Sequence, residues 1–221
     1  FQRYCLKFYL MKICTVCKNN KIEFFLNIEN LDYWQCKLCK ATMLNPIHHI
    51  SSNKEKKHYL KHNNEIDDTR YRDFLTNLIE PLKDKICVND IGLDYGCGYA
   101  PALADILKKD GFNIELYDPF FFKNENIFFR KFNFITCSEV VEHFFKPYEE
   151  FNKIDGLLAR KSCFAVMTSF MTEDYLFKNW YYRRDPTHVV FYKKITFKVI
   201  ANQRNWELTF PSKNLVFFHK K

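Results

Sequence analysis

The sequence predicts an α/β protein in which a mostly parallel sheet follows a small cysteine-rich module. From residue 86 onward, short apolar segments alternate with segments of helical periodicity, a pattern that favours a parallel sheet covered on both faces. Before residue 46, two CxxC pairs lie among short segments rich in aromatic and β-branched residues. The predicted organisation is therefore a module at 11–45, a linker with N-terminal helices at 46–85, and the α/β domain at 86–221.

The segment before the α/β domain is polar and basic at first and becomes helical later. Residues 46–64 are polar, basic and rich in histidine and predict a connecting segment, whereas the apolar side chains of 67–82 recur at helical spacing. Pro81 is expected to end that helix or to kink it near its end.

Within the α/β domain, strands and helices are expected in alternation, and a closing hairpin adds an antiparallel edge. The predicted strands lie within 86–96, 113–118, 132–137, 163–170, 206–211 and 215–220. The predicted helices are 101–111, a segment from about Glu139, 148–159 and 195–205.

The N-terminal residues, the apolar runs and the cysteines indicate where in the cell the protein is located. Met11 is the expected natural start, so residues 1–10 are treated as an upstream extension. No apolar run reaches the ~20 residues of a membrane span, and the first residues do not form a signal peptide. Nine cysteines, mostly in CxxC pairs or apolar surroundings, are typical of a reducing compartment. We therefore expect a cytoplasmic protein with no membrane partner.

Two cysteine pairs separated by 18 residues match the spacing of a zinc ribbon. Each pair on a tight turn directs two thiolates at one ion, and four thiolates complete a tetrahedron without an open position, so a structural rather than a catalytic zinc ion is expected. Surface redox cysteines are the alternative. The predicted ligands are Cys14, Cys17, Cys36 and Cys39.

Most of the net charge of +8 belongs to the N-terminal part of the chain. Residues 1–64 hold 11 Lys and Arg against 4 Asp and Glu, a net charge of +7, whereas the remaining 157 residues hold 23 against 22. Such a basic arm favours a partner that carries phosphates, although it is also compatible with a solvated basic face that only keeps the protein soluble.

The stretch LDYGCGYAPAL at 93–103 predicts a ligand turn where a strand enters a helix. Gly96 and Gly98 allow the backbone to turn tightly and to approach a ligand. A carboxylate at Asp94 repels a diphosphate and attracts a sulfonium or ammonium group, and Asp118, 20 residues beyond Gly98, can accept the two hydroxyls of a ribose. A nicotinamide fingerprint requires glycine where Pro101 stands. The turn therefore predicts S-adenosylmethionine (SAM).

The motifs LDYGCGYAPALADIL, ELYD and FITCSEVVEHF resemble those of class I SAM-dependent methyltransferases, over roughly residues 87–221. The resemblance implies a Rossmann-like, mostly parallel seven-stranded sheet with an antiparallel C-terminal hairpin. It also implies that an acid in the first motif orients the methionine end of SAM, that the glycines pass beneath the cofactor, and that EVVEHF lies beside the transferred methyl group. The implied cofactor-binding residues are Asp94, Gly96, Gly98, Asp118, Pro119 and Glu139.

Two departures from the family pattern concern the cofactor site. Ala100 stands where the family has a third glycine, and only 13 residues separate Asp118 from Phe132. Because a helix–strand–helix excursion needs more residues, the third strand is expected to be short or absent. Phe120 or Phe121 is then expected to pack on the adenine.

The predicted substrate side involves two further segments. On the expected helix after the fourth strand, Glu139 and His143 share one face, and His143 could act as a base. Alternatively, Thr136 and Glu139 form a capping box and His143 packs at the edge of the cofactor. In NWYYRRDPTHVVFY, His188 is a second possible base, and the predicted substrate contacts are Trp180, Tyr182, Arg183 and Arg184. The alternative for that stretch is an amphipathic loop with Asp185 paired to an arginine.

The predicted function is SAM-dependent methylation of an acceptor, with a phosphate-bearing small molecule or RNA favoured. The family resemblance also implies that Tyr59, His62 and Tyr71 close over the cofactor. One alternative is a catalytically inactive zinc-ribbon and Rossmann-like protein that binds nucleic acid, and another is a nicotinamide oxidoreductase. No NPPY-like motif follows the fourth strand, which disfavours methylation of the adenine amine.

Overall fold

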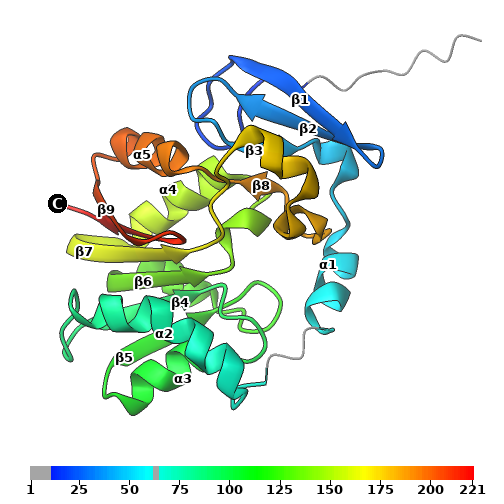
Figure 1. Ribbon diagram of the computed structural model, residues 1–221. Coiled ribbons are helices and arrows are strands. Elements are labelled where there is room, and N and C mark those ends of the chain that lie inside the picture. The colour runs from blue at the N-terminus through cyan, green and yellow to red at the C-terminus, as the bar shows by residue number, and fades with distance from the viewer. Residues whose placement is uncertain (1–10, 62–64) are drawn as a thin grey trace, which may run out of the picture.

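The computed structural model describes residues 11–61 and 65–221; residues 1–10 lie outside the described part of the chain. It contains a six-stranded sheet flanked by helices and a four-stranded sheet beside it (Figure 1). None of the helices in the described ranges is long and apolar enough to span a membrane.

The larger sheet has the order β5-β4-β6-β7-β10-β9. The first four of these strands are parallel, and β10 pairs antiparallel with both β7 and β9, which confirms the predicted closing hairpin. The strands are β4 (Ile91–Tyr95), β5 (Asn113–Tyr117), β6 (Phe132–Ser138), β7 (Leu158–Met167), β9 (Glu207–Ser212) and β10 (Leu215–His219).

The Rossmann-like α/β prediction is confirmed, with six strands in this sheet instead of seven. The connection between β5 and β6 contains only a short 3-10 helix, η2 (Glu125–Phe129), and β5 is therefore the edge strand. An additional parallel strand would need two crossovers, and the 13 residues between Asp118 and Phe132 are too few for them.

Helices cover both faces of this sheet (Figure 1). One face packs against α2 (Thr69–Lys83) and α3 (Ala102–Lys109), and the other against α4 (Pro147–Leu157) and α5 (Lys194–Gln203). Neighbouring residues of a strand alternate between the two cores: Phe217 belongs to the first and Phe218 to the second. This period of two is what a fully buried strand requires.

The cysteine-rich module forms a second sheet with the order β1-β2-β3-β8. Its strands are β1 (Ile22–Ile28), β2 (Leu31–Cys36), β3 (Thr42–Leu44) and β8 (Val190–Phe191). Because β8 comes from the segment between β7 and α5, the module is joined to the larger domain by backbone pairing. The buried residues of the module belong to the same apolar core as α4 and α5.

Two local predictions need correction. The connecting segment 46–64 is not irregular throughout, since it contains η1 (Pro46–His48) and α1 (Ser52–Tyr59). No α-helix begins near Glu139: this residue has a φ of 54°, and only a 3-10 turn, η3 (Val141–His143), precedes α4. A left-handed backbone conformation cannot start a right-handed helix, so the predicted capping box is also wrong. Two further 3-10 helices, η4 (Asp174–Asn179) and η5 (Tyr181–Arg184), precede β8.

Candidate active site

A cavity of about 720 Å³ lies where β4, β5 and β6 end. Its wall includes Gly96 after β4, Asp118 after β5 and Glu139 after β6. The carboxyl ends of adjacent parallel strands form the usual ligand crevice of an open α/β sheet. The volume suits a nucleoside-sized ligand, since small-molecule pockets span roughly 300–1,000 Å³.

The glycine turn between β4 and α3 forms the floor of this cavity. Gly96 and Gly98 have φ values of +85° and +66°, a region that favours glycine. A Cβ atom on Gly96 would lie 2.5 Å from a methyl carbon of Val140, whereas one on Gly98 would meet nothing within 4 Å. Gly98 thus leaves space that a side chain would fill, and a ligand can approach its backbone closely.

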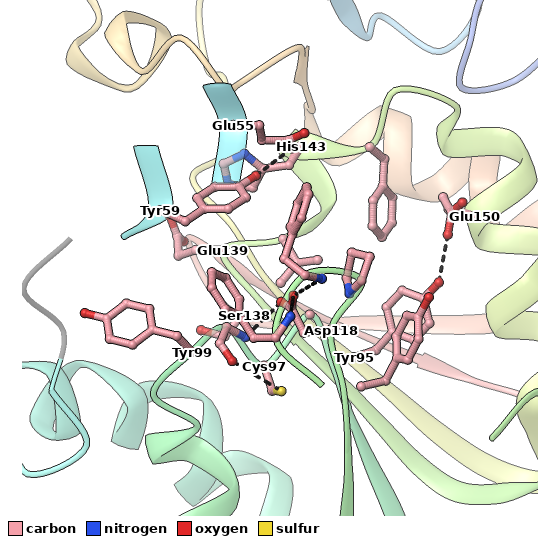
Figure 2. Close-up of a pocket in the computed structure, with 18 of the residues that line it drawn as sticks. Glu55, Tyr59, Tyr95, Cys97, Tyr99, Asp118, Ser138, Glu139, His143 and Glu150 are labelled. Carbon is pink, nitrogen blue, oxygen red and sulfur yellow. Dashed lines mark hydrogen bonds between the residues drawn. The ribbon is translucent and has the colours of Figure 1, made fainter. Parts of the chain in front are cut away.

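Asp118 connects this turn to the loop after β5. Its Oδ2 atom accepts a hydrogen bond from the backbone N–H of Gly98 at 3.0 Å, and its Oδ1 atom accepts from Phe120 and Phe121 at 2.8 and 3.1 Å. Figure 2 shows these bonds at the centre of the pocket. A carboxylate oxygen has two acceptor positions, so Oδ2 can accept one further hydrogen bond.

Asp94 lies beneath the turn and is not part of the cavity wall. Its carboxyl is buried, and Thr136 donates a hydrogen bond to Asp94 Oδ1 at 2.9 Å. Burial raises the pKa of Asp94 to about 7, and the charge of Asp118 adds to the effect. The carboxyl therefore changes charge near neutral pH.

At the end of β6, a hydroxyl group connects two carboxyls, of which Glu142 is buried and Glu139 lines the cavity. The Tyr182 hydroxyl lies 3.0 Å from Glu139 Oε2 and donates to Glu142 Oε1, and Thr168 donates to Glu142 Oε2 at 2.9 Å. Burial, reinforced by the neighbouring Glu142, raises the pKa of Glu139 to about 9. Burial also raises the pKa of Glu142, which is completely inaccessible to solvent.

His143 and His188 lie side by side in the cavity wall, with ring centroids 4.7 Å apart. The Nδ1 atom of His143 lies 3.1 Å from the Thr187 carbonyl oxygen, and that of His188 lies 2.6 Å from the Tyr182 carbonyl oxygen. Because a carbonyl only accepts, each Nδ1 carries the hydrogen. Burial and the neighbouring His143 lower the pKa of His188, which favours a neutral imidazole.

Helices α1 and α2 contribute aromatic residues to the cavity wall. Tyr59 donates to Glu55 Oε1 at 2.8 Å, and its ring meets that of His143 edge-on at 5.4 Å (Figure 2). Tyr59 and Tyr71 both line the cavity. His62, assigned to the same covering segment, lies outside the described residues.

The aromatic and basic stretch at 180–184 is arranged differently from the prediction. None of the four predicted substrate residues lines the cavity: Tyr182 is buried behind it, and Arg183 is 7% exposed with its Nε atom bonded to the Lys178 carbonyl oxygen. Trp180 packs against Phe177 and Arg184 is exposed. The Asp185 carboxylate pairs with His58 at 3.2 Å, and no arginine of the described chain pairs with it.

Sequence reasoning missed Glu142 and Glu55. Glu142 stands inside the EVVEHF motif, directly before His143, but an acid on an expected helix carries no sign that it will be buried. Glu55 lies in a run of lysines that indicates a solvated surface. The motif alone could have drawn attention to Glu142.

The four paired cysteines converge as predicted. The Sγ atoms of Cys14 and Cys39 are 3.6 Å apart, as are those of Cys17 and Cys36, and all four lie within 4.8 Å of one another. Both CxxC turns have the same form: the residue after the second cysteine has a φ of 59°, and its backbone N–H bonds the carbonyl of the first cysteine.

The comparisons with known proteins agree with this fold. The sequence model of a family described as a methyltransferase domain matches residues 60–209. The match covers more than half of the chain, which therefore belongs to this family, and the protein is a SAM-dependent methyltransferase. No curated protein matches the sequence.

Two solved structures illustrate the likeness in fold. Magnesium protoporphyrin IX methyltransferase from Synechocystis, determined with bound S-adenosylhomocysteine (SAH), aligns with a TM-score of 0.51 and 11% identity, over 77% of this chain and 95% of that one. A SAM-dependent methyltransferase from Archaeoglobus fulgidus aligns with a TM-score of 0.50 and 19% identity, over 62% of this chain and 69% of that one.

Proposed function

We propose that this methyltransferase binds SAM across the glycine turn and methylates an acceptor that enters beside His143 and His188. The observation that carries the proposal is the Asp118 carboxylate, which lies at the end of β5, lines the cavity and retains an acceptor position next to Gly98. A ribose hydroxyl fits that position. The loop that begins at Asp118 also places Phe120 and Phe121 in the wall, where an adenine ring can pack.

SAM supplies an activated methyl group, so the main task of the protein is to align the acceptor with it. We assign the acceptor end to Glu139, His143 and His188, which line the same part of the cavity. The hydrogen bonds at both Nδ1 atoms fix the ring orientations and leave the lone pair of each histidine on Nε2. Asp94, one layer below, supports the cationic end of SAM by charge.

The acceptor class that we propose is a phosphate-bearing small molecule or RNA. Support comes from the charge of +7 on residues 1–64 and from Lys146 and Lys153, both of which line the cavity. A phosphate placed there would be attracted over the range of a Debye length, about 8–10 Å at ordinary salt.

We also propose that the four cysteines bind one structural zinc ion. With zinc–sulfur bonds of about 2.3 Å, tetrahedral ligands lie about 3.8 Å apart, close to the separations of 3.6 Å. A cytoplasmic location would keep these cysteines reduced, and no disulfide joins any of the eight cysteines within the described ranges.

Calorimetric titration with SAM tests the cofactor site. Asp118→Asn keeps an acceptor for Phe120 and Phe121 but loses the charge, and we expect it to weaken binding about tenfold to a hundredfold, as for loss of a charged hydrogen-bond acceptor. Asp84→Asn, on an exposed residue at the end of α2, is the control. If Asp118→Asn bound SAM with the same affinity as the control and the wild type, the assignment of Asp118 to the cofactor site would be contradicted. Absence of SAM binding by folded protein, together with salt-dependent RNA binding, would support the inactive nucleic-acid-binding alternative.

A further inference from the structure

Three side chains at the acceptor end form a cluster of metal-ligating atoms. Glu142, His143 and His188 each place one such atom within 4.8 Å of the other two. His143 Nε2 lies 3.9 Å from Glu142 Oε1. Two imidazoles and one carboxylate are a ligand set used by divalent first-row metal ions.

The surroundings orient these groups as they are oriented in metal sites. Each histidine donates its Nδ1 hydrogen to a backbone carbonyl, of Thr187 or Tyr182, and this outer bond leaves the lone pair on Nε2, as it does in histidines that bind metal ions. Glu142 is fixed in the same way, because both of its oxygens accept hydrogen bonds from hydroxyl groups.

Two neighbouring carboxyls at this point offer oxygen ligands to a cation, and a bound cation would favour their ionised form. Glu139 and Glu142 share the Tyr182 hydroxyl, so the buried Glu142 carboxyl and the Glu139 carboxyl in the cavity wall lie on either side of one oxygen. Within residues 11–61 and 65–221, no lysine or arginine forms an ion pair with either of them. Buried carboxylates are normally paired with a cation or bound to a metal ion.

We propose that Glu142, His143 and His188 bind a divalent first-row cation, with Glu139 as a further oxygen donor beside it. Metal–ligand bonds of about 2.1 Å place neighbouring ligands about 3.0–3.4 Å apart, so small rotations that bring the three atoms together by about 1 Å complete the site. His143 and His188 line the cavity, and the coordination positions that the protein leaves open therefore face the acceptor.

This site deepens the proposed function, on which its role rests, by indicating an acceptor hydroxyl. A cation lowers the pKa of a bound hydroxyl. The hydroxyl releases its proton to water, and the oxygen forms a bond to the methyl carbon of SAM. The carbon–sulfur bond breaks in the same step, with its electron pair on sulfur, which leaves a methyl ether and SAH.

Titration with Mn²⁺ of protein that holds one zinc ion per chain, with no excess zinc, tests the site without any acceptor when it is followed by the electron paramagnetic resonance signal of free Mn²⁺. Mn²⁺ competes poorly for thiolates and should leave the four cysteines untouched. We expect one bound Mn²⁺ per chain, and affinity reduced on the order of tenfold or more in His143→Gln and His188→Gln. His219→Gln, at the end of β10 and outside the cluster, should bind Mn²⁺ as the wild type does.

Failure of the wild-type protein to bind Mn²⁺ at millimolar concentration would overturn the proposal, whatever the stability of the variants. So would retention of full affinity in both histidine variants. SAM titration of the same samples separates the two proposals: SAM binding without Mn²⁺ binding leaves the methyltransferase assignment intact and removes the metal site. Mn²⁺ binding without SAM binding supports the metal site and removes the proposed cofactor site.

Discussion

Replacement of Asp94 by asparagine should make the cofactor-free protein more stable at alkaline pH. The Asp94 carboxyl is buried, and its pKa is raised from 3.8 to about 7, mainly by burial. Asparagine has nearly the same shape, and its side-chain oxygen can still accept the hydrogen bond from Thr136. The variant therefore removes the ionisation while it keeps the packing.

The sign and size of the effect follow from the pKa shift. Between pH 3.8 and 7 the folded protein retains a proton that the unfolded chain releases, so the free energy of unfolding falls as the pH rises through this window. A shift of about three pKa units corresponds to a loss of about 4 kcal/mol above pH 7. About 2 kcal/mol of that loss falls between pH 5.5 and 8.

Urea unfolding of zinc-loaded protein without SAM, at those two pH values, measures the effect. The stability of Asp94→Asn relative to the wild type should increase by about 2 kcal/mol from the lower to the higher pH. Asp84→Asn, at an exposed position, controls for the loss of one carboxylate. An equal difference between Asp94→Asn and the wild type at both pH values would refute the reasoning. The variant should also bind SAM more weakly, because it lacks the charge beneath the cationic group.

Three further predictions concern other parts of the molecule. Gly98→Ala should lower the free energy of unfolding by about 1–2 kcal/mol, because residue 98 has a positive φ, and it should weaken SAM binding in calorimetry. Gly156→Ala is the control, because this glycine lies in α4 with open space at its Cβ position, and SAM binding should not change. Metal analysis should find one tightly bound zinc ion per chain, and Cys36→Ser should lose it together with much of the tertiary circular dichroism signal, since structural zinc supplies roughly 10–16 kcal/mol. Tyr182→Phe should lower the free energy of unfolding by about 1–3 kcal/mol in urea, because Glu142 loses a buried donor; an unchanged midpoint would contradict that hydrogen bond.

The geometry around the glycine turn could be predicted because its signals are local. Gly96 and Gly98 belong to one turn, and Asp118 stands at the end of the next strand, where parallel strands bring their carboxyl ends together. Hydrophobic alternation was enough to place those strands, and the short spacing after Asp118 indicated the missing strand.

The acceptor end could not be predicted because it is assembled from distant segments. Glu142 and Tyr182 are 40 residues apart in the sequence, and only the tertiary fold brings the hydroxyl to the carboxyl. The predicted helix at Glu139 is absent for a similar reason. The backbone N–H of Glu139 donates to the carbonyl of Met167 on β7, at 2.8 Å. This bond holds Glu139 in a left-handed conformation that its sequence does not favour.

The same tertiary pairing gives the cysteine module a structural part in the acceptor site. The backbone of Val189, directly after His188, forms two hydrogen bonds of 2.9 Å: its N–H donates to the carbonyl of Glu142, and its own carbonyl accepts from the N–H of Leu44 in β3. Loss of the folded cysteine module would therefore release one side of the segment that carries His188. The glycine turn and Asp118 have no such connection to the module among the described contacts. Zinc removal should accordingly disturb the acceptor end of the cavity more than the cofactor end.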